Sequence, residues 1–147
     1  MEDNTKFTWD EETGIATCTL LNPDSGKYVT GVAKCHPDDR DMMNKITGQN
    51  IAFHRALLRL YKEKRSSLRV EKKALQNLYN TFMIMPDFDK DNRYIRVTRH
   101  KLYSLEEDIN TYCRLINDTW LYLQDYMVSK DKFYKLTRSN REIKQEN

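Results

Sequence analysis

The chain has 147 residues, of which 39% are hydrophobic and 32% are charged, and its formal net charge is +3. This length is typical of one domain that buries its own core, so folding needs neither a disulfide framework nor a structural metal. No apolar run approaches the roughly 20 residues that span a membrane, the acidic segment Met1–Asp10 lacks the pattern of a signal peptide, and the odd number of cysteines favours a reducing, cytoplasmic environment.

The charge is distributed unevenly along the chain. Residues 1–50 carry five Lys and Arg against nine Asp and Glu, residues 51–103 carry thirteen against five, and residues 104–147 carry seven against eight. A basic block between two mildly acidic ones indicates an anionic partner for the middle third. Glycine and proline are scarce, at 4 and 3 residues, which favours long uninterrupted helices.

The first third predicts a β-hairpin or a three-stranded meander over residues 7–35. Phe7–Trp9 has the composition of a short strand, and β-branched residues alternate with period two over Ile15–Leu21. Asn22–Gly26 is rich in turn-forming residues, so Tyr28–Cys35 is expected to return as the next antiparallel strand.

Helices are predicted after this sheet. Pro37 and the aspartates behind it favour a short helix over residues 37–46. Thr47 is expected to cap a second helix over residues 49–83, in which apolar residues recur with the helical period. Ser66-Ser67 is a weak point where this helix could bend.

The last helix is expected over residues 104–128. Ser104 and Glu107 match a capping box, and apolar residues then recur in steps of four and three: Leu105, Ile109, Tyr112, Ile116, Trp120, Leu123 and Met127. This pattern predicts antiparallel packing on the second helix. The preceding segment Arg93–Arg99 is ambiguous between a strand and a basic loop, and residues 129–147 are expected to form a flexible basic tail. The sequence therefore predicts a single α+β domain over residues 1–128.

A row of basic residues on the second helix is the first candidate binding surface. It consists of Arg55, Arg59, Lys62, Arg69 and Lys73, widened by Lys64, Arg65 and Lys72. Such a row extends along about 27 Å of helix, and it could follow a phosphate backbone. It could equally be a solvated helix face that Glu63 and Glu71 partly neutralise.

A second basic group follows the loop after Pro86. It contains Arg93, Arg96, Arg99, His100 and Lys101, with Tyr94 and Tyr103 interleaved. Cations and aromatic rings together are typical of surfaces that bind single-stranded nucleic acid. The alternative is a solvated connector between two helices.

No set of residues predicts catalysis or metal binding. Asp87, Asp89 and Asp91 resemble the start of a calcium loop, but Thr98 stands where a bidentate glutamate is required. Cys35 and His36 are adjacent and have no second Cys/His pair to complete a metal site or a nucleophilic dyad. We therefore expect no catalytic residue, no metal and no cofactor, and a protein that acts by binding.

Parts of the sequence resemble a family of small proteins carried by bacteriophages and prophages of Gram-positive bacteria. The resemblance rests on Gly31–Arg40, Thr47–Ala52, Arg55-Ala56 and Phe7–Cys18, and it covers roughly residues 7–80. Small phage-borne proteins without an active site often inhibit host defence, as anti-CRISPR proteins do, or act as nucleic-acid-binding accessory factors.

The resemblance thus implies a protein of the bacterial host cytoplasm that binds and inhibits a host defence protein, such as a type II CRISPR nuclease or its guide RNA complex. The alternative is a module that binds nucleic acid directly through the basic face of the long helix. A third possibility is self-association through exposed aromatic residues such as Trp9 and Trp120. No membrane partner is expected, and the sequence leaves the oligomeric state open.

Overall fold

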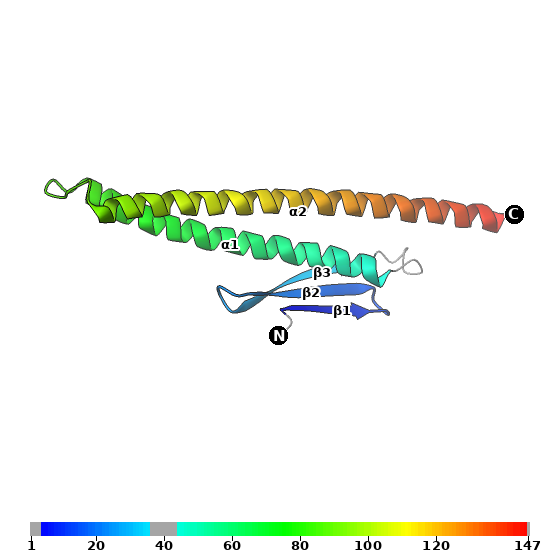
Figure 1. Ribbon diagram of the computed structural model, residues 1–147. Helices are drawn as coiled ribbons and strands as arrows, with labels where there is room; N and C mark the ends of the chain where they lie inside the picture. The colour runs from blue at the N-terminus through cyan, green and yellow to red at the C-terminus, as the bar shows by residue number, and fades with distance from the viewer. Residues whose placement is uncertain (1–3, 36–43, 147) are drawn as a thin grey trace. The chain divides into compact units, whose positions relative to one another are not determined.

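A computed structural model describes the backbone of residues 4–35 and 44–146 and the side chains as far as residue 132 (Figure 1). The elements in chain order are β1 (Thr5–Asp10), β2 (Ile15–Asn22), β3 (Lys27–Lys34), α1 (Lys45–Met83) and α2 (Arg93–Glu146). A three-stranded antiparallel sheet followed by two long helices confirms the predicted α+β class.

The chain divides into two compact units, which are described separately. The sheet unit comprises Met1–Leu60 and Asn117–Asn147, and the hairpin unit comprises Tyr61–Ile116. Each long helix contributes one part to each unit. The single domain expected over residues 1–128 stays a prediction, since compact units of one chain can also fold together.

The sheet follows the strand order β1-β2-β3, so β2 is the central strand. Two glycines with positive φ, Gly14 at 69° and Gly26 at 71°, close its turns, where most other residues would be strained. The N–H of Gly14 donates to the carbonyl of Asp10, and that of Gly26 donates to the carbonyl of Asn22, each at 2.8 Å. The predicted meander and its turn at Asn22–Gly26 are therefore confirmed.

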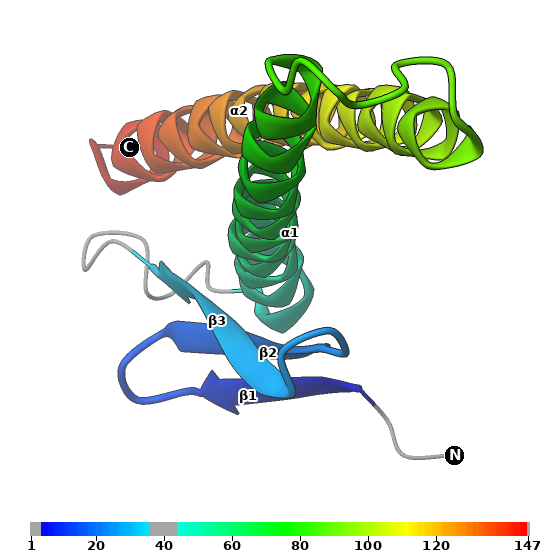
Figure 2. The same ribbon diagram turned by 90° about the vertical axis from the view of Figure 1, so that its left-hand side faces the viewer.

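One face of the sheet packs against the first turns of α1, as Figure 2 shows. The buried residues alternate along the strands and face the small side chains of the helix: Ala16, Cys18, Leu20, Val29 and Ala33 with Ala52 and Ala56. The helix backbone approaches β3 closely, because a Cβ at Gly31 would collide with the carbonyl oxygen of Ala52 and the amide nitrogen of Ala56. Small residues on both the strand and the helix permit this contact.

In the hairpin unit, the second part of α1 and the first part of α2 run antiparallel and pack along a common seam. The buried and partly buried positions of the seam recur in steps of four and three: Tyr61, Arg65, Leu68, Lys72, Leu75, Tyr79 and Phe82 on α1, and Ile95, Thr98, Leu102, Leu105, Ile109, Tyr112 and Ile116 on α2. A seven-residue repeat on both helices is the pattern of a two-stranded coiled coil.

Side-chain contacts fix the register of this pair. Three of them repeat with a spacing of seven residues: Arg65 with Cys113, Lys72 with Glu106, and Tyr79 with Arg99. We call the side of the seam on which these contacts lie the Arg99 flank. On the other side, the Glu71 flank, Lys101 pairs with Glu71 at 3.9 Å.

The basic segment 93–99 forms the first turns of α2, which corrects the expected strand or loop. Asn92 caps this helix, since its Oδ1 accepts a hydrogen bond from the N–H of Ile95 at 2.9 Å. Ile95 and Thr98 are buried in the seam. Ser104 consequently lies inside the helix and does not cap it. The tertiary contact decides the conformation of a segment whose β-branched residues also suit a strand.

The boundaries of both helices differ from the prediction. α1 begins at Lys45, where Asn44 Oδ1 accepts a hydrogen bond from the N–H of Ile46 at 2.9 Å, so Asn44 is the cap and Thr47 is not. The helix also continues without a break through Ser66-Ser67. α2 extends to Glu146, beyond the predicted end at residue 128. The short helix expected over residues 37–46 falls mostly on residues 36–43, outside the described part of the chain.

Candidate nucleic-acid interface

Arg55, the first residue of the predicted basic row, is committed to packing inside the sheet unit. Its guanidinium donates to the carbonyl oxygen of Val32 at 2.7 Å and lies 3.8 Å from the sulfur of Met127. These contacts tie α1 to β3 and to α2. Arg55 is therefore partly exposed and engaged in packing, whereas Arg59, one turn later in the same unit, is exposed.

Arg65 and Lys72 lie in the seam of the hairpin unit. One terminal nitrogen of Arg65 donates to Cys113 Sγ at 3.9 Å, and its Nε is buried with no hydrogen-bond partner among the described residues. Lys72 forms an ion pair with Glu106, and both side chains are partly exposed. Both cations of the predicted basic surface therefore take part in contacts between the two helices.

The remaining cations of α1 in the hairpin unit form a row beside the seam. The row steps by four and three residues and contains no carboxylate: Lys62, Ser66, Arg69, Lys73, Gln76 and Asn80. All are exposed except Gln76, which is partly buried and whose Nε2 donates to Asn80 Oδ1 at 2.9 Å. The uncharged members were missed from sequence, although they share the spacing of the cations.

The row borders the Arg99 flank. The seam residues whose contacts define this flank are Arg65, Lys72 and Tyr79. Positions 62, 69 and 76 each lie three residues before one of them, and residues three apart are neighbours on a helix. The acidic residue Glu71 of α1 pairs with Lys101 on the opposite flank. Exposed positive charge and hydrogen-bonding groups are thus gathered on one side of α1.

α2 adds two arginines to the same flank. Arg99 Nε donates to the hydroxyl of Tyr79 at 3.3 Å, which holds the guanidinium at the edge of the seam. Arg96 is three residues earlier and exposed. We call the five cations gathered here the cationic face: Lys62, Arg69, Lys73, Arg96 and Arg99. Glu106 borders this face from α2, and its pairing with Lys72 offsets its charge.

Arg93 lies further round α2, on its solvent side. Together with Arg96, Val97 and His100 it lines a shallow depression. Tyr103, four residues after Arg99, is 66% exposed. The second basic group predicted from sequence is therefore an exposed helical surface, of which part joins the cationic face and part does not.

The carboxylate of Asp89 in the calcium-like segment stabilises the loop that precedes α2. Asp89 Oδ1 accepts a hydrogen bond from the N–H of Asp91 at 3.0 Å, and Asn92 caps α2. In the described part of the chain, no group of three His, Cys, Asp or Glu residues converges as metal ligands would. His36, which was considered with Cys35, lies outside the described residues.

Among the described residues, neither helix has the length and apolarity needed to cross a membrane. The chain matches no protein-family model, no curated protein and no solved structure. The relation to phage-borne proteins therefore stays a prediction, and the functional argument rests on the arrangement of the side chains.

Proposed function

We propose that the protein binds nucleic acid through the cationic face of the hairpin unit. The observation that carries this proposal is the exposed row on α1 that contains no carboxylate. From Lys62 to Asn80 the row extends along about 27 Å of helix, a length that spans several phosphates of one strand. Cations on such a surface displace counterions from the phosphates, and the Ser, Gln and Asn side chains can hydrogen-bond phosphate oxygens.

The two flanks of the hairpin support a specific role for this face. An ordinary solvated helix surface mixes both signs of charge, and the Glu71 flank does so, since it combines Lys64, Glu71, Lys101 and Asp108. The Arg99 flank instead carries five exposed cations, and Glu106, which borders it from α2, is paired with Lys72. A difference between two flanks of one coiled coil is not explained by solubility alone.

A charge-reversal experiment tests the proposal. Binding to a fluorescent 20-base-pair duplex and to a 20-nucleotide single strand would be measured by anisotropy for the full chain and for Arg69→Glu with Lys73→Glu. We expect about a tenfold or greater loss of affinity. The matched control, Lys64→Glu with Lys101→Glu, changes the net charge equally on the Glu71 flank and should lose far less. Equal losses in the two variants would reject a dedicated face.

A protein partner is the second candidate. In the sheet unit, α2 exposes several large apolar side chains, among them Trp120 at 50%, Leu121 at 47% and Val128 at 52%, and exposed apolar groups of this kind favour protein contacts. With the resemblance to phage proteins, this supports the inhibitor of a host defence protein such as a type II CRISPR nuclease.

Co-expression with such a nuclease tests the inhibitor function. The wild-type chain is expected to protect a targeted plasmid from cleavage, and Trp120→Ser with Leu121→Ser is expected to lose this protection while the charge-reversal variant of the cationic face retains it. Unimpaired cleavage by several nuclease orthologues in the presence of the wild-type chain would count against this candidate.

A further inference from the structure

Tyr103 differs from the other tyrosines of the hairpin unit because its ring makes no contact within the fold. Tyr61 and Tyr112 meet across the seam, with ring centroids 6.1 Å apart. The hydroxyl of Tyr79 accepts a hydrogen bond from α2, and the ring of Tyr94 meets a phenylalanine of α1 edge-on. Tyr103 is 66% exposed and makes no ring contact or side-chain hydrogen bond with any residue that the structure describes.

The spacing along α2 places Tyr103 on the cationic face. Tyr103 follows Arg96 by seven residues and Arg99 by four, and side chains at these spacings share one side of a helix. The contacts that fix the register bring this stretch of α2 alongside the part of α1 that carries Lys73 and Gln76. An exposed aromatic ring therefore lies beside the row of cations and amides on α1.

The carboxylates near Tyr103 indicate which part of a nucleic acid this side of α2 can accept. Glu106 and Glu107 follow the ring by three and four residues, whereas the row on α1 from Lys62 to Asn80 contains no carboxylate. Carboxylates repel phosphates, but the flat faces of the bases are uncharged and stack on aromatic rings. The arrangement therefore suits phosphates along α1 and bases over α2.

We propose that the cationic face is a site for single-stranded nucleic acid, with the phosphates bound along α1 and a base stacked on Tyr103. This inference rests on the proposed function, and it names the form of nucleic acid that the same face selects. The base faces of a duplex are already stacked on one another, so they are not available to the ring. A duplex still contacts the cations but gains nothing from Tyr103.

Anisotropy of the full chain with the single strand and the duplex of the charge-reversal experiment tests this inference. The wild type should bind the single strand several-fold more tightly than the duplex. Tyr103→Leu removes the ring and should weaken the single strand about fivefold or more and the duplex less than about twofold, as expected for the loss of one stacked base. Tyr103→Phe keeps the ring and should bind as the wild type does. The control Tyr28→Leu should change neither affinity, although Tyr28 of the sheet unit is 55% exposed and has Lys6 at 5.8 Å from its ring.

The outcomes separate this inference from the proposed function. If charge reversal on the cationic face weakens both forms while Tyr103→Leu changes both equally or neither, the face stands and its selection of single strands is wrong. If the wild type binds neither form, both proposals are wrong. Single strands of DNA and of RNA are both measured against their duplexes. Preference for a single strand of either kind supports the inference, and the tighter of the two identifies the natural ligand.

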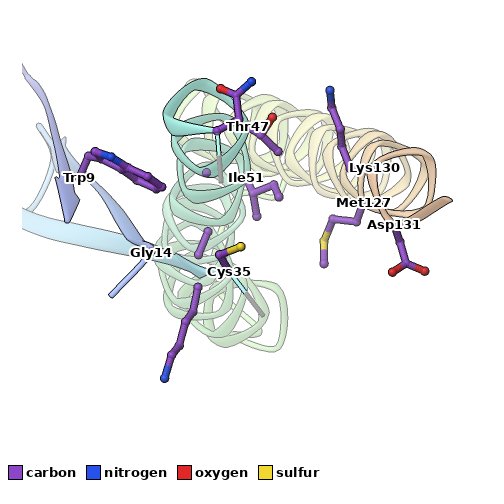
Figure 3. Close-up of a pocket in the computed structure, with 12 residues that line it drawn as sticks. Trp9, Gly14, Cys35, Thr47, Ile51, Met127, Lys130 and Asp131 are labelled. Carbon is purple, nitrogen blue, oxygen red and sulfur yellow. The ribbon is translucent and has the colours of Figure 1, made fainter. Parts of the chain in front are cut away.

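A tryptophan at position 103 reports on stacking directly. Both native tryptophans lie in the sheet unit, where Trp9 lines a cavity of about 250 Å³ (Figure 3) and Trp120 is 50% exposed. In a Trp120→Phe background, Tyr103→Trp should lose most of its added fluorescence on binding a single strand, because a stacked base quenches the indole, and little on binding a duplex. Tyr28→Trp in the same background should keep its fluorescence with both. Equal quenching at position 103 by the two forms, or none by a single strand that binds, would overturn the inference.

Discussion

Gly31 is the residue on which the contact between sheet and helix depends. Any Cβ at this position would meet backbone atoms of Ala52 and Ala56, and backbone cannot move aside as a flexible side chain can. Gly31→Ala is therefore expected to lower the free energy of unfolding by about 2–3 kcal/mol, as overpacking of a tight core does. Urea denaturation measures this loss.

The control for this substitution is Val32→Ala on the adjacent position of β3. Val32 is 45% exposed, so its truncation should change the free energy of unfolding by less than about 0.5 kcal/mol. A Gly31→Ala protein with an unchanged urea midpoint would show that the helix does not lie as close to β3 as described.

The ionisation of Asp10 makes the stability of the β1–β2 turn depend on pH. The hydroxyl of Thr13 and the backbone N–H of Glu12 hold the pKa of the Asp10 carboxyl below its usual 3.8. The Glu12 N–H donates to Oδ1 at 2.9 Å and is the better-defined cause, since the Thr13 hydroxyl falls short of hydrogen-bond geometry.

A lowered pKa in the folded state means that the charged carboxylate favours folding above the ordinary value, and that this contribution is lost as the pH falls through the lowered value. Asp10→Ala should therefore be less stable than the wild type at pH 6, and the difference should shrink on acidification to pH 3. Urea midpoints at the two pH values measure it. A difference that stays constant would show that the turn does not favour the ionised form.

At the scale of the elements, the seam of the hairpin unit combines apolar layers with two basic residues. Arg65 occupies a seam position with a buried Nε that lacks a partner among the described residues. An apolar side chain of similar size at such a position often gives a more stable coiled coil. Arg65→Leu is therefore expected to raise the free energy of unfolding by about 1 kcal/mol.

Thermal and urea unfolding of Arg65→Leu and of Arg69→Leu together test this expectation. Arg69 lies on the exposed row one turn away, so its replacement should change stability by less than about 0.5 kcal/mol. If Arg65→Leu destabilised the protein instead, the contact of Arg65 with Cys113 would be worth more than the burial of an apolar side chain.

Patterns that are local in the chain predicted much of this architecture. Alternation over Ile15–Leu21 and the turn residues Asn22–Gly26 placed the strands within two residues, because period two and turn formation are properties of neighbouring residues. The spacing from Leu105 to Ile116 likewise predicted a long helix that buries one side, whereas Trp120 of the same pattern is 50% exposed. Both signals come from side chains that are apolar or conformationally special.

The rest depended on contacts that are distant in sequence. Arginine and lysine usually lie at the surface. Only the register with α2 shows that Arg65 and Lys72 lie in the seam. The helical state of residues 93–99 likewise follows from Ile95 and Thr98 meeting α1. Sequence spacing correctly grouped Lys62, Arg69 and Lys73 on one side of a helix, but it did not separate them from Arg55, which turns toward Val32.

At the scale of the whole molecule, the small net charge of +3 conceals an ordered distribution. The strongly basic block at residues 51–103 does not present all its cations to solvent. Packing contacts within the protein involve Arg55, Arg65 and Lys72. Lys101 pairs with Glu71. The five cations of the cationic face remain at the surface. A partner would therefore meet a positive surface on a protein that is nearly neutral, which makes the salt dependence of binding a direct measure of how many of these cations it uses.

Binding that involves all five cations of the cationic face is expected to give a slope of about −4 to −4.5 in a plot of log K against log salt concentration for duplex DNA, because each neutralised phosphate contributes about −0.9. Anisotropy titrations between 50 and 250 mM salt, roughly the range in which such slopes are measured, provide the plot. Arg69→Glu with Lys73→Glu removes two contacts, so the magnitude of its slope should decrease by about 2.

The control variant Lys64→Glu with Lys101→Glu should leave the slope unchanged, since those side chains lie on the Glu71 flank. A wild-type slope near zero would mean that phosphates are not the partner of this face, and its segregated cations would then be better explained by contact with an acidic protein surface.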